Sequence, residues 1–226
     1  TIVDTATFKS ILNKLPPENV LIYDNSKTAQ SSPHGFHYIH NPENPGVSKA
    51  YNYAASWAKK QRFSHLLLLD SDSYFPEDAI EIYTASAIKH MDNLILPQMN
   101  AGERIISPFW FKWGKSWYGD NIPVGEIDFK DKAAINSGML IPLKQYEQTK
   151  GYDEMIPMDW SDIAFCRQLS RLKIKGIKIM MDVKHDLSES RSASLESASF
   201  RFKMYMIGMK RTPSTHFLER ILMLIW

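Results

Sequence analysis

The chain has 226 residues, of which 44% are hydrophobic and 23% are charged, and its formal net charge is +2. This composition predicts a globular domain with a substantial core and excludes the strongly basic balance of a typical nucleic-acid-binding protein, so we expect no nucleic acid as a partner. The single cysteine, Cys166, excludes an internal disulfide framework, and no apolar run reaches the roughly 20 residues that span a bilayer, so we expect a cytoplasmic protein.

In the first hundred residues, predicted helices alternate with short apolar strands. Helical periodicity covers 5–15 and 47–61, and a third helix is predicted to begin at Pro76, which suits a first helical position and is followed by two acids. The predicted strands are 19–24, 36–39, 66–69 and 93–97. This alternation predicts an α/β fold with a mostly parallel sheet flanked by helices.

The rest of the chain is less regular. No periodicity is evident between 98 and 132, which is rich in tryptophan and which we expect to be irregular. The remaining predicted elements are a periodic segment at 134–141, a helix at 159–172, a strand at 177–181 and later helices. Because the sequence shows no repeats or linkers, one domain over 1–226 is the simplest prediction. For the strongly apolar segment 216–226 we favour a core-packing or oligomerising helix, which leaves a homodimer open, over a peripheral contact with the inner face of the cell membrane.

The most informative stretch is an apolar strand that ends in Asp70, Ser71 and Asp72. Alternate side chains of a strand share a face, and a loop after the strand would crowd the same two carboxylates, so their oxygens converge in either arrangement. Hard cations such as Mg2+ or Mn2+ bind one or two carboxylates together with substrate phosphates. We therefore expect a metal-bound diphosphate here. The alternative is a strand-end turn in which Asp and Ser satisfy backbone donors.

Other polar motifs occur along the chain in a fixed order. Residues 22–26 read Ile-Tyr-Asp-Asn-Ser, 41–52 run from Asn-Pro-Glu-Asn-Pro-Gly to Ala-Tyr-Asn, 136–138 read Asn-Ser-Gly, 151–154 read Gly-Tyr-Asp-Glu and 159–162 read Asp-Trp-Ser-Asp. Together with the Asp-Ser-Asp motif, this series resembles the motifs of the family-two glycosyltransferases of GT-A fold, especially rhamnosyltransferase-like members that build surface polysaccharides. The resemblance covers about 19–190.

The resemblance implies a Rossmann-like GT-A domain in which 1–100 bind the nucleotide, 101–190 hold the acceptor and the catalytic residue, and 191–226 form a helical tail. The chain begins at Thr1 without the first strand of the usual fold, so we expect that strand to be missing from it. The implied reaction is metal-dependent, inverting transfer of a hexosyl or deoxyhexosyl group from a nucleotide-sugar, with UDP or dTDP as the nucleotide, to a saccharide or lipid-linked acceptor.

The resemblance also implies roles for single residues. Asp162 would be the general base, with a helix N-terminal carboxylate as the alternative, although Ser161 and Ala164 stand where acids are often found. Mn2+ or Mg2+ would bind Asp70 and Asp72 together with His185, which is otherwise an ordinary surface histidine. The expected nucleotide and donor contacts are Asp24, Asn25, Ser26, Asn44, Gly46, Asn52, Asp70, Ser71 and Asp72. The expected acceptor contacts are Trp110, Trp113, Trp117, Asn136, Ser137, Gly138, Asp159 and Trp160.

Two other interpretations stay open. Haloacid-dehalogenase-type phosphatases also place Asp-x-Asp after an apolar strand, which would make Asp70 a nucleophile and Asp72 an acid. The position of the motif after two strand and helix units disfavours this hypothesis. A noncatalytic module that binds nucleotide-sugar or saccharide is favoured by Ser161 and by the missing first strand. The tryptophan-rich stretch could in turn be an internal packing loop instead of a surface for sugar rings.

Overall fold

The protein is built on a mixed sheet with helices on both faces. Its computed structural model describes residues 1–186, 195–214, 219 and 221. The main strands, in spatial order, are β3 (His65–Leu67), β11 (Leu140–Pro142), β5 (Leu94–Ala101), β12 (Lys175–His185) and β4 (Ser73–Tyr74). β3, β5 and β12 run in one direction, whereas β11 runs between β3 and β5 in the opposite direction. The α/β class with a mostly parallel sheet is therefore confirmed.

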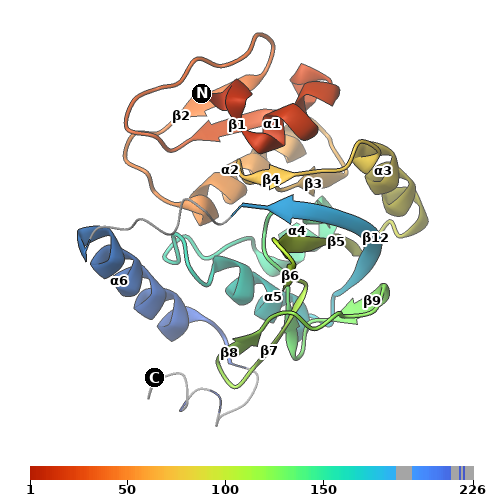
Figure 1. Cartoon of the computed structure of the whole chain (residues 1–226), viewed down its shortest axis with the longest axis vertical. Coiled ribbons are helices and arrows are strands. Elements are labelled where there is room, and N and C mark those ends of the chain that lie inside the picture. The colour runs from red at the N-terminus through yellow and green to blue at the C-terminus, as the bar shows by residue number, and fades with distance from the viewer. Residues whose placement is uncertain (187–194, 215–218, 220, 222–226) are drawn as a thin grey trace.

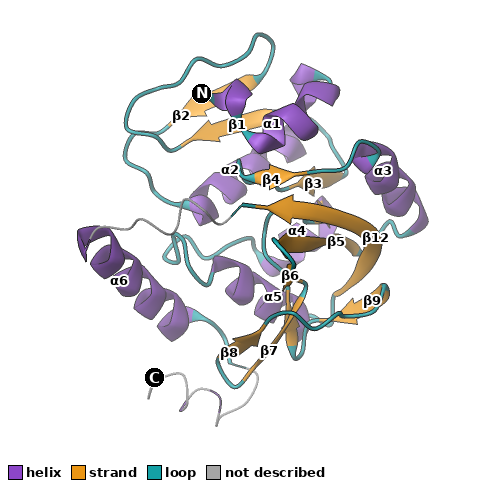
Figure 2. Cartoon of the chain, viewed as in Figure 1, coloured by secondary structure: helices purple, strands orange, loops and turns teal. Residues whose placement is uncertain are grey.

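Two hydrophobic cores cover the two faces of the sheet, because neighbouring side chains of a buried strand point to opposite sides. Leu94 and Leu96 of β5 belong to one core, and Ile95 and Met99 belong to the other. Figure 2 shows the helices in purple around the orange strands. The first core lies under α2 (Val47–Lys60), α4 (Leu143–Thr149) and α5 (Ser161–Arg171), and the second lies under α1 (Ala6–Ser10) and α3 (Ala79–Lys89).

A separate pair of strands lies near the N-terminus, beside α1 (Figure 1). β1 (Leu21–Asp24) and β2 (His37–His40) pair in parallel and form their own two-stranded sheet. Three short 3-10 turns accompany them: η1 (Ile2–Asp4), η2 (Leu12–Lys14) and η3 (Pro17–Asn19). The helix predicted over 5–15 is thus split into α1 and η2, because the backbone leaves the helical conformation at Ile11.

The stretch between 98 and 132, which we predicted to be irregular, contains several short strands. β6 (Arg104–Ser107) pairs with β5 and β9 (Gly125–Asp128) pairs with β12, while β7 (Phe109–Lys112) lies between β8 (Lys115–Trp117) and β10 (Lys132–Ala133) in a small three-stranded sheet. The prediction was wrong because β7 alternates buried Phe109 and Phe111 with exposed Trp110 and Lys112. Three of these four residues are aromatic, so the sequence carries no apolar and polar alternation.

Two further differences concern helices. α3 begins at Ala79 with Asp78 as its N-cap, so the start predicted at Pro76 was three residues too early. A turn precedes the helix, because the Pro76 carbonyl oxygen accepts from the Ala79 N–H. α6 (Leu195–Arg211) is the helical part of the tail, whereas the prediction for 216–226 falls almost wholly outside the described residues. In the part of the chain that the structure describes, no helix combines the length and the hydropathy needed to cross a membrane.

Candidate active site

The carboxylates of the Asp-Ser-Asp motif lie in a loop that buried hydroxyl groups hold in place. After β3, the backbone N–H of Asp70 donates to Ser137 Oγ at 3.1 Å. Thr7 Oγ1 donates to the carbonyl oxygen of Asp70 and to that of Ser73, the latter at 2.9 Å. Thr7, Ser73 and Ser137 are all buried, and breaking hydrogen bonds of buried groups costs free energy. This network therefore fixes the loop between β3 and β4.

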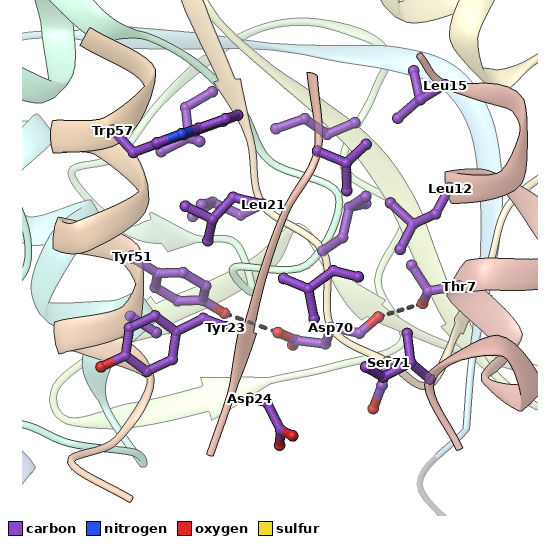
Figure 3. A pocket seen from close by; sticks show the side chains of 18 of the residues that line it. Thr7, Leu12, Leu15, Leu21, Tyr23, Asp24, Tyr51, Trp57, Asp70 and Ser71 are labelled. Carbon is purple, nitrogen blue, oxygen red and sulfur yellow. Dashed lines mark hydrogen bonds between the residues drawn. The ribbon is translucent and has the colours of Figure 1, made fainter. Parts of the chain in front are cut away.

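The Asp70 carboxylate points toward α2, where the buried Tyr51 hydroxyl donates to its Oδ1 at 2.8 Å (Figure 3). Burial raises the pKa of Asp70, the hydrogen bond from Tyr51 lowers it, and the charge of Asp72 raises it again, with an upward net shift. Burial disfavours the ionised form of Asp70, so a positive charge nearby would stabilise its carboxylate. We did not predict Tyr51, although it directly precedes Asn52 in a motif that we singled out.

Asp72 and His185 lie side by side. The pairing of β12 with β4 places His185 opposite Ser73, so that its Nδ1 is 3.0 Å from Ser73 Oγ and 3.4 Å from Asp72 Oδ1. Apart from this contact, Asp72 Oδ1 is buried without a hydrogen-bond partner, which fits an oxygen that binds a cation. The described residues contain no group of three His, Cys, Asp or Glu side chains that could hold a metal ion together. A cation here would therefore need further ligands from a bound substrate.

Asp162 lies in the first turn of α5, after Trp160 turns the chain in a left-handed conformation with φ of 74°. Its side chain is half-buried, and its Oδ1 accepts the Ile163 N–H at 2.7 Å. Burial raises the pKa of Asp162 to about 6 against backbone hydrogen bonds that lower it, and the negative charges of Asp159 and Asp70 add to the rise. A carboxylate with this pKa suits a general base near neutral pH.

Tyr51 lies within electrostatic reach of all three carboxylates. Burial raises the pKa of its hydroxyl most, and the charges of Asp70, Asp162 and Asp72 raise it further. The structure thus brings the residues predicted for the metal and for the base around one side chain of α2. Tyr118, just after β8, is a second residue that we did not predict. Burial raises its pKa, and the charge of Asp162 also raises it, so its ring lies near the same carboxylate.

A cavity of about 770 Å3 lies beside Asp70, with β1 and β3 in its walls. Figure 3 shows Tyr51 and Trp57 of α2 on one side of it, and Leu12 and Leu15 on the other. Apolar side chains line most of the cavity, whereas Asp24, Asp70 and Ser71 lie together toward one end. An apolar wall with a few convergent polar groups is the usual composition of a ligand pocket.

Asp24 ends β1 and organises the loop that follows. Its Oδ1 accepts from the backbone N–H of Ser26 at 2.8 Å and from the Ser26 hydroxyl, and its Oδ2 accepts from the Tyr38 hydroxyl at 2.6 Å and the Gln30 N–H at 3.1 Å. Burial opposes ionisation, but these hydrogen bonds lower the pKa of Asp24 to about 2. The Asp24 carboxylate is therefore already bonded within its loop, whereas Asn25 Oδ1 is buried without a hydrogen-bond partner and Asn25 lines the cavity.

The start of α2 makes contacts that explain its motif without a ligand. Gly46 has φ of 95°, and a Cβ there would lie 2.2 Å from a carbonyl oxygen of the loop before α5. Asn52 donates to the Tyr152 carbonyl oxygen and to Glu154, both at 3.0 Å, and accepts from the Tyr152 N–H at 2.9 Å and from the Tyr146 hydroxyl of α4 at 2.6 Å. All four hydrogen-bonding positions of this amide are used, so the donor contact predicted for Asn52 would require bonds to break. Asn44 is exposed in the turn before α2.

The Asn-Ser-Gly segment lies beneath the site. Asn136 is 8% exposed and bonds to the Tyr152 hydroxyl at 2.8 Å and to Ser161 Oγ at 3.1 Å, and Ser137, 1% exposed, supports the Asp70 loop. Gly138 is also buried, with φ of 81°. This burial leaves the segment little surface for the acceptor contact that we predicted, and its role in the structure is to support the loops above it.

The other predicted acceptor residues divide into two groups. Trp160 is buried, with the rings of Phe111 and Tyr205 edge-on at centroid distances of 5.6 Å and 5.3 Å, and Asp159 accepts from Arg201 of α6 at 3.2 Å. α6 therefore covers this side of the site. The three tryptophans are exposed on the small sheet: Trp110, Trp113 and Trp117.

Comparisons with known proteins identify the family and the fold. The family model described as Glycosyl transferase family 2 matches residues 5–143. S. aureus TarS 1–349, solved in complex with UDP, is 12% identical with a TM-score of 0.52 over 97% of this chain and 67% of its own. GalNAc-T7, solved with UDP, GalNAc and Mn2+, is 11% identical with a TM-score of 0.57 over 80% of this chain and 40% of its own. These likenesses show a shared GT-A fold. A comparison with curated protein sequences finds no match.

Proposed function

This chain belongs to glycosyl transferase family 2, and on that premise we propose that it transfers a hexosyl or deoxyhexosyl group from a nucleotide-sugar to a saccharide or lipid-linked acceptor, with inversion and with a divalent metal. We further propose UDP or dTDP as the nucleotide and surface polysaccharide synthesis as the setting. The observation that carries the proposal is the convergence of Asp70, Asp72 and Asp162 around Tyr51, which lines the cavity together with Asp70.

At the donor end, Asp70 and Asp72 would hold Mn2+ or Mg2+, with His185 beside Asp72. The ion supplies Lewis-acid stabilisation of the charge that develops on the leaving diphosphate. Two observations support this assignment: the unpartnered, buried Oδ1 of Asp72, and the raised pKa of Asp70. The nucleoside would occupy the polar end of the cavity, where Asn25 offers its buried and unpartnered Oδ1.

At the acceptor end, Asp162 would take the proton of the attacking hydroxyl. As that proton moves to the carboxylate, the acceptor oxygen forms its bond to the anomeric carbon and the bond from that carbon to the diphosphate oxygen breaks. A single displacement of this kind inverts the anomeric centre. The pKa of about 6 supports Asp162 as a base that is ionised at neutral pH, and the rings of Tyr118 and Tyr205 would border the acceptor.

The family match argues against the haloacid-dehalogenase-type phosphatase, because the matched residues 5–143 include the Asp-Ser-Asp motif on which that alternative depended. Asp70 is also a poor nucleophile in this setting. Its Oδ1 already accepts a hydrogen bond from the buried Tyr51 hydroxyl at 2.8 Å, which makes that oxygen less nucleophilic. The noncatalytic binding module differs from the proposed enzyme only in turnover, so the experiment must measure binding and transfer separately.

The proposal is tested by thermal unfolding of the purified chain with UDP-, dTDP- and GDP-sugars, each with and without Mn2+. A donor at about 100 times its Kd should add about 2.7 kcal/mol of stability, which Asp72→Ala should abolish. Glu103→Gln, which changes an exposed acid at the turn between β5 and β6, is the matched control and should leave the effect intact. Product configuration by NMR then tests inversion. Binding without turnover would favour the noncatalytic module, and no metal-dependent binding of any donor would refute the proposal.

A further inference from the structure

A glycine brings α6 close to the loop that precedes α5. Gly208 lies inside α6, and a Cβ at this position would be 2.5 Å from the Asp159 carbonyl oxygen and 2.6 Å from the Trp160 Cβ. The two helices lie side by side (Figure 1). A glycine in the interior of a helix costs about 1 kcal/mol relative to alanine. Gly208 therefore serves the contact between α6 and this loop at the expense of the helix itself.

Side chains before and after this glycine strengthen the contact. Met209 is buried and belongs to the first hydrophobic core. Arg201 donates to Asp159 at 3.2 Å, and Arg211 donates to the two carboxylate oxygens of Asp153 at 2.7 Å and 3.1 Å. Both ion pairs are partly exposed, so each contributes little free energy by itself. Burial and ion pairs together fix where α6 lies against the loop.

The loop that α6 contacts sets the start of α5. Trp160 is the N-cap of α5 and has φ of 74°, a left-handed conformation that costs about 1 to 2 kcal/mol in a residue with a Cβ. Its carbonyl oxygen accepts the Ala164 N–H at 2.8 Å, a hydrogen bond that closes the turn in which Asp162 lies. Its ring contacts those of Phe111 and of Tyr205 on α6. A conformation of this cost persists only where its neighbours hold it, and α6 supplies several of them.

We propose that α6 positions the general base: the close contact at Gly208 holds Trp160, and Trp160 holds the turn of α5 that carries Asp162. This inference rests on the proposed function, because it takes Asp162 as the base. Gly208 would act through the backbone of the loop without touching a substrate, so it is a positioning residue. A displacement of about 1 Å at a reacting group can cost about 100-fold in rate. Moving α6 should therefore lower turnover without weakening donor binding, since the donor end of the site lies on the loop after β3.

The first measurement does not depend on sugar transfer. Gly208→Ala puts a Cβ against the Asp159 carbonyl oxygen, so α6 should shift although alanine favours a helix. Amide hydrogen exchange of the full chain, measured by mass spectrometry, should then rise about 10-fold in residues 158–165 and stay the same in residues 66–74 around the Asp-Ser-Asp motif. Ser199→Ala introduces the same residue at an exposed position of α6 and should change neither segment. Wild-type exchange of 158–165 in Gly208→Ala would overturn the proposal.

The second measurement separates positioning from support of the fold. Donor affinity of Gly208→Ala, from calorimetry with Mn2+ and UDP, should match that of the wild type. Its kcat, measured as release of nucleotide diphosphate from the donor that stabilises the wild type most, should fall by about 10- to 100-fold. Faster exchange with a wild-type kcat would limit α6 to a structural role and overturn the proposal. No turnover by the wild type with any donor would instead refute the proposed function, and with it the role of Asp162 as a base.

A second pair of changes covers the case in which Gly208→Ala does not fold. Arg201→Gln with Arg211→Gln removes the two partly exposed ion pairs between α6 and the loop. This variant should exchange faster in 158–165 and lose about 3- to 10-fold in kcat, and Arg201→Lys with Arg211→Lys should recover most of that loss. Lys203→Gln with Lys210→Gln removes the same charge from exposed positions of α6 and is the matched control. Equal losses in the two glutamine variants would reveal a general effect of charge and overturn the proposal.

Discussion

Replacing Asp162 by asparagine should abolish most transfer and at the same time stabilise the protein. Asparagine keeps the size of the side chain and an oxygen for the Ile163 N–H, but it cannot take a proton from an acceptor hydroxyl. Loss of a general base lowers a rate by at least about 100-fold. The gain in stability has a separate origin, which is that the folded chain holds an ionised carboxylate in a place that disfavours its charge.

The size of the stability effect follows from the pKa. Asp162 rises from an ordinary 3.8 to about 6 on folding, so the folded state is penalised whenever the carboxylate is ionised. At pH 8 the penalty is about 3 kcal/mol at most, and at pH 5 it is about half as large, because the folded carboxyl is then mostly protonated. The stability of the wild type relative to Asp162→Asn should therefore decline as pH rises from 5 to 8. A chain of this size gains about 2 to 4 °C in Tm per kcal/mol.

The assay is thermal unfolding of both proteins at pH 5, 6, 7 and 8 in chelator, so that no cation offsets the charge. Asp153→Asn is the matched control, because Asp153 forms a comparable ion pair with Arg211, and this variant should lose a little stability at every pH. Wild-type transfer should also rise with pH and level off above about 6, where the base is ionised. A variant Asp162→Asn that is no more stable than the wild type at pH 8 would refute the argument that burial disfavours this charge.

The remaining predictions concern the donor end and the backbone. Asp72→Ala should lose metal-dependent donor binding without unfolding, as calorimetry with Mn2+ and UDP would measure; unchanged affinity would remove the metal site. Tyr51→Phe should lower stability by about 1 to 3 kcal/mol in denaturant unfolding and weaken donor binding, because Asp70 loses a buried hydrogen bond; wild-type stability would contradict this. Gly46→Ala should unfold the start of α2, whereas Gly102→Ala, at positive φ with no atom in the way, should cost only about 1 to 2 kcal/mol; equal losses would contradict the proposed clash.

The sequence predicts long, periodic elements well and short ones poorly. α2 begins at the predicted residue, and α5 lies within its predicted range, because an amphipathic stripe over three or four turns has few alternatives. β6 to β10 were missed because they have two to four residues. β6 and β8 form hairpins with the strands before them, whereas β9 and β10 pair with strands distant in the chain. Strands this short leave no periodicity along the chain.

For the site, the sequence singles out three carboxylates that the structure brings near Tyr51, but it does not indicate what each of them contacts. Asp70 and Asp72 could be chosen from their place after a strand, whereas Asp162 was chosen from the family resemblance of its segment. Asn52 illustrates the limit, since its amide proves to hold the turn at 151–154 through three hydrogen bonds and accepts a fourth from Tyr146 of α4. Tyr51, one position earlier, faces the carboxylates instead. Adjacent residues of a helix point about 100° apart, and only the packed structure decides which of them faces the site.

The electrostatics of the site favour an arriving cation over any internal partner. Burial raises the pKa of Asp70 and of Asp162, and the charge of Asp72 adds to the rise at Asp70. Among the described groups that act on these two carboxyls, only His185 is a potential cation, and it acts on Asp70. A folded protein that gathers three acids without a permanent positive charge gives up stability. A divalent ion that arrives with a diphosphate would restore it, so that donor binding and ionisation of the carboxylates become coupled.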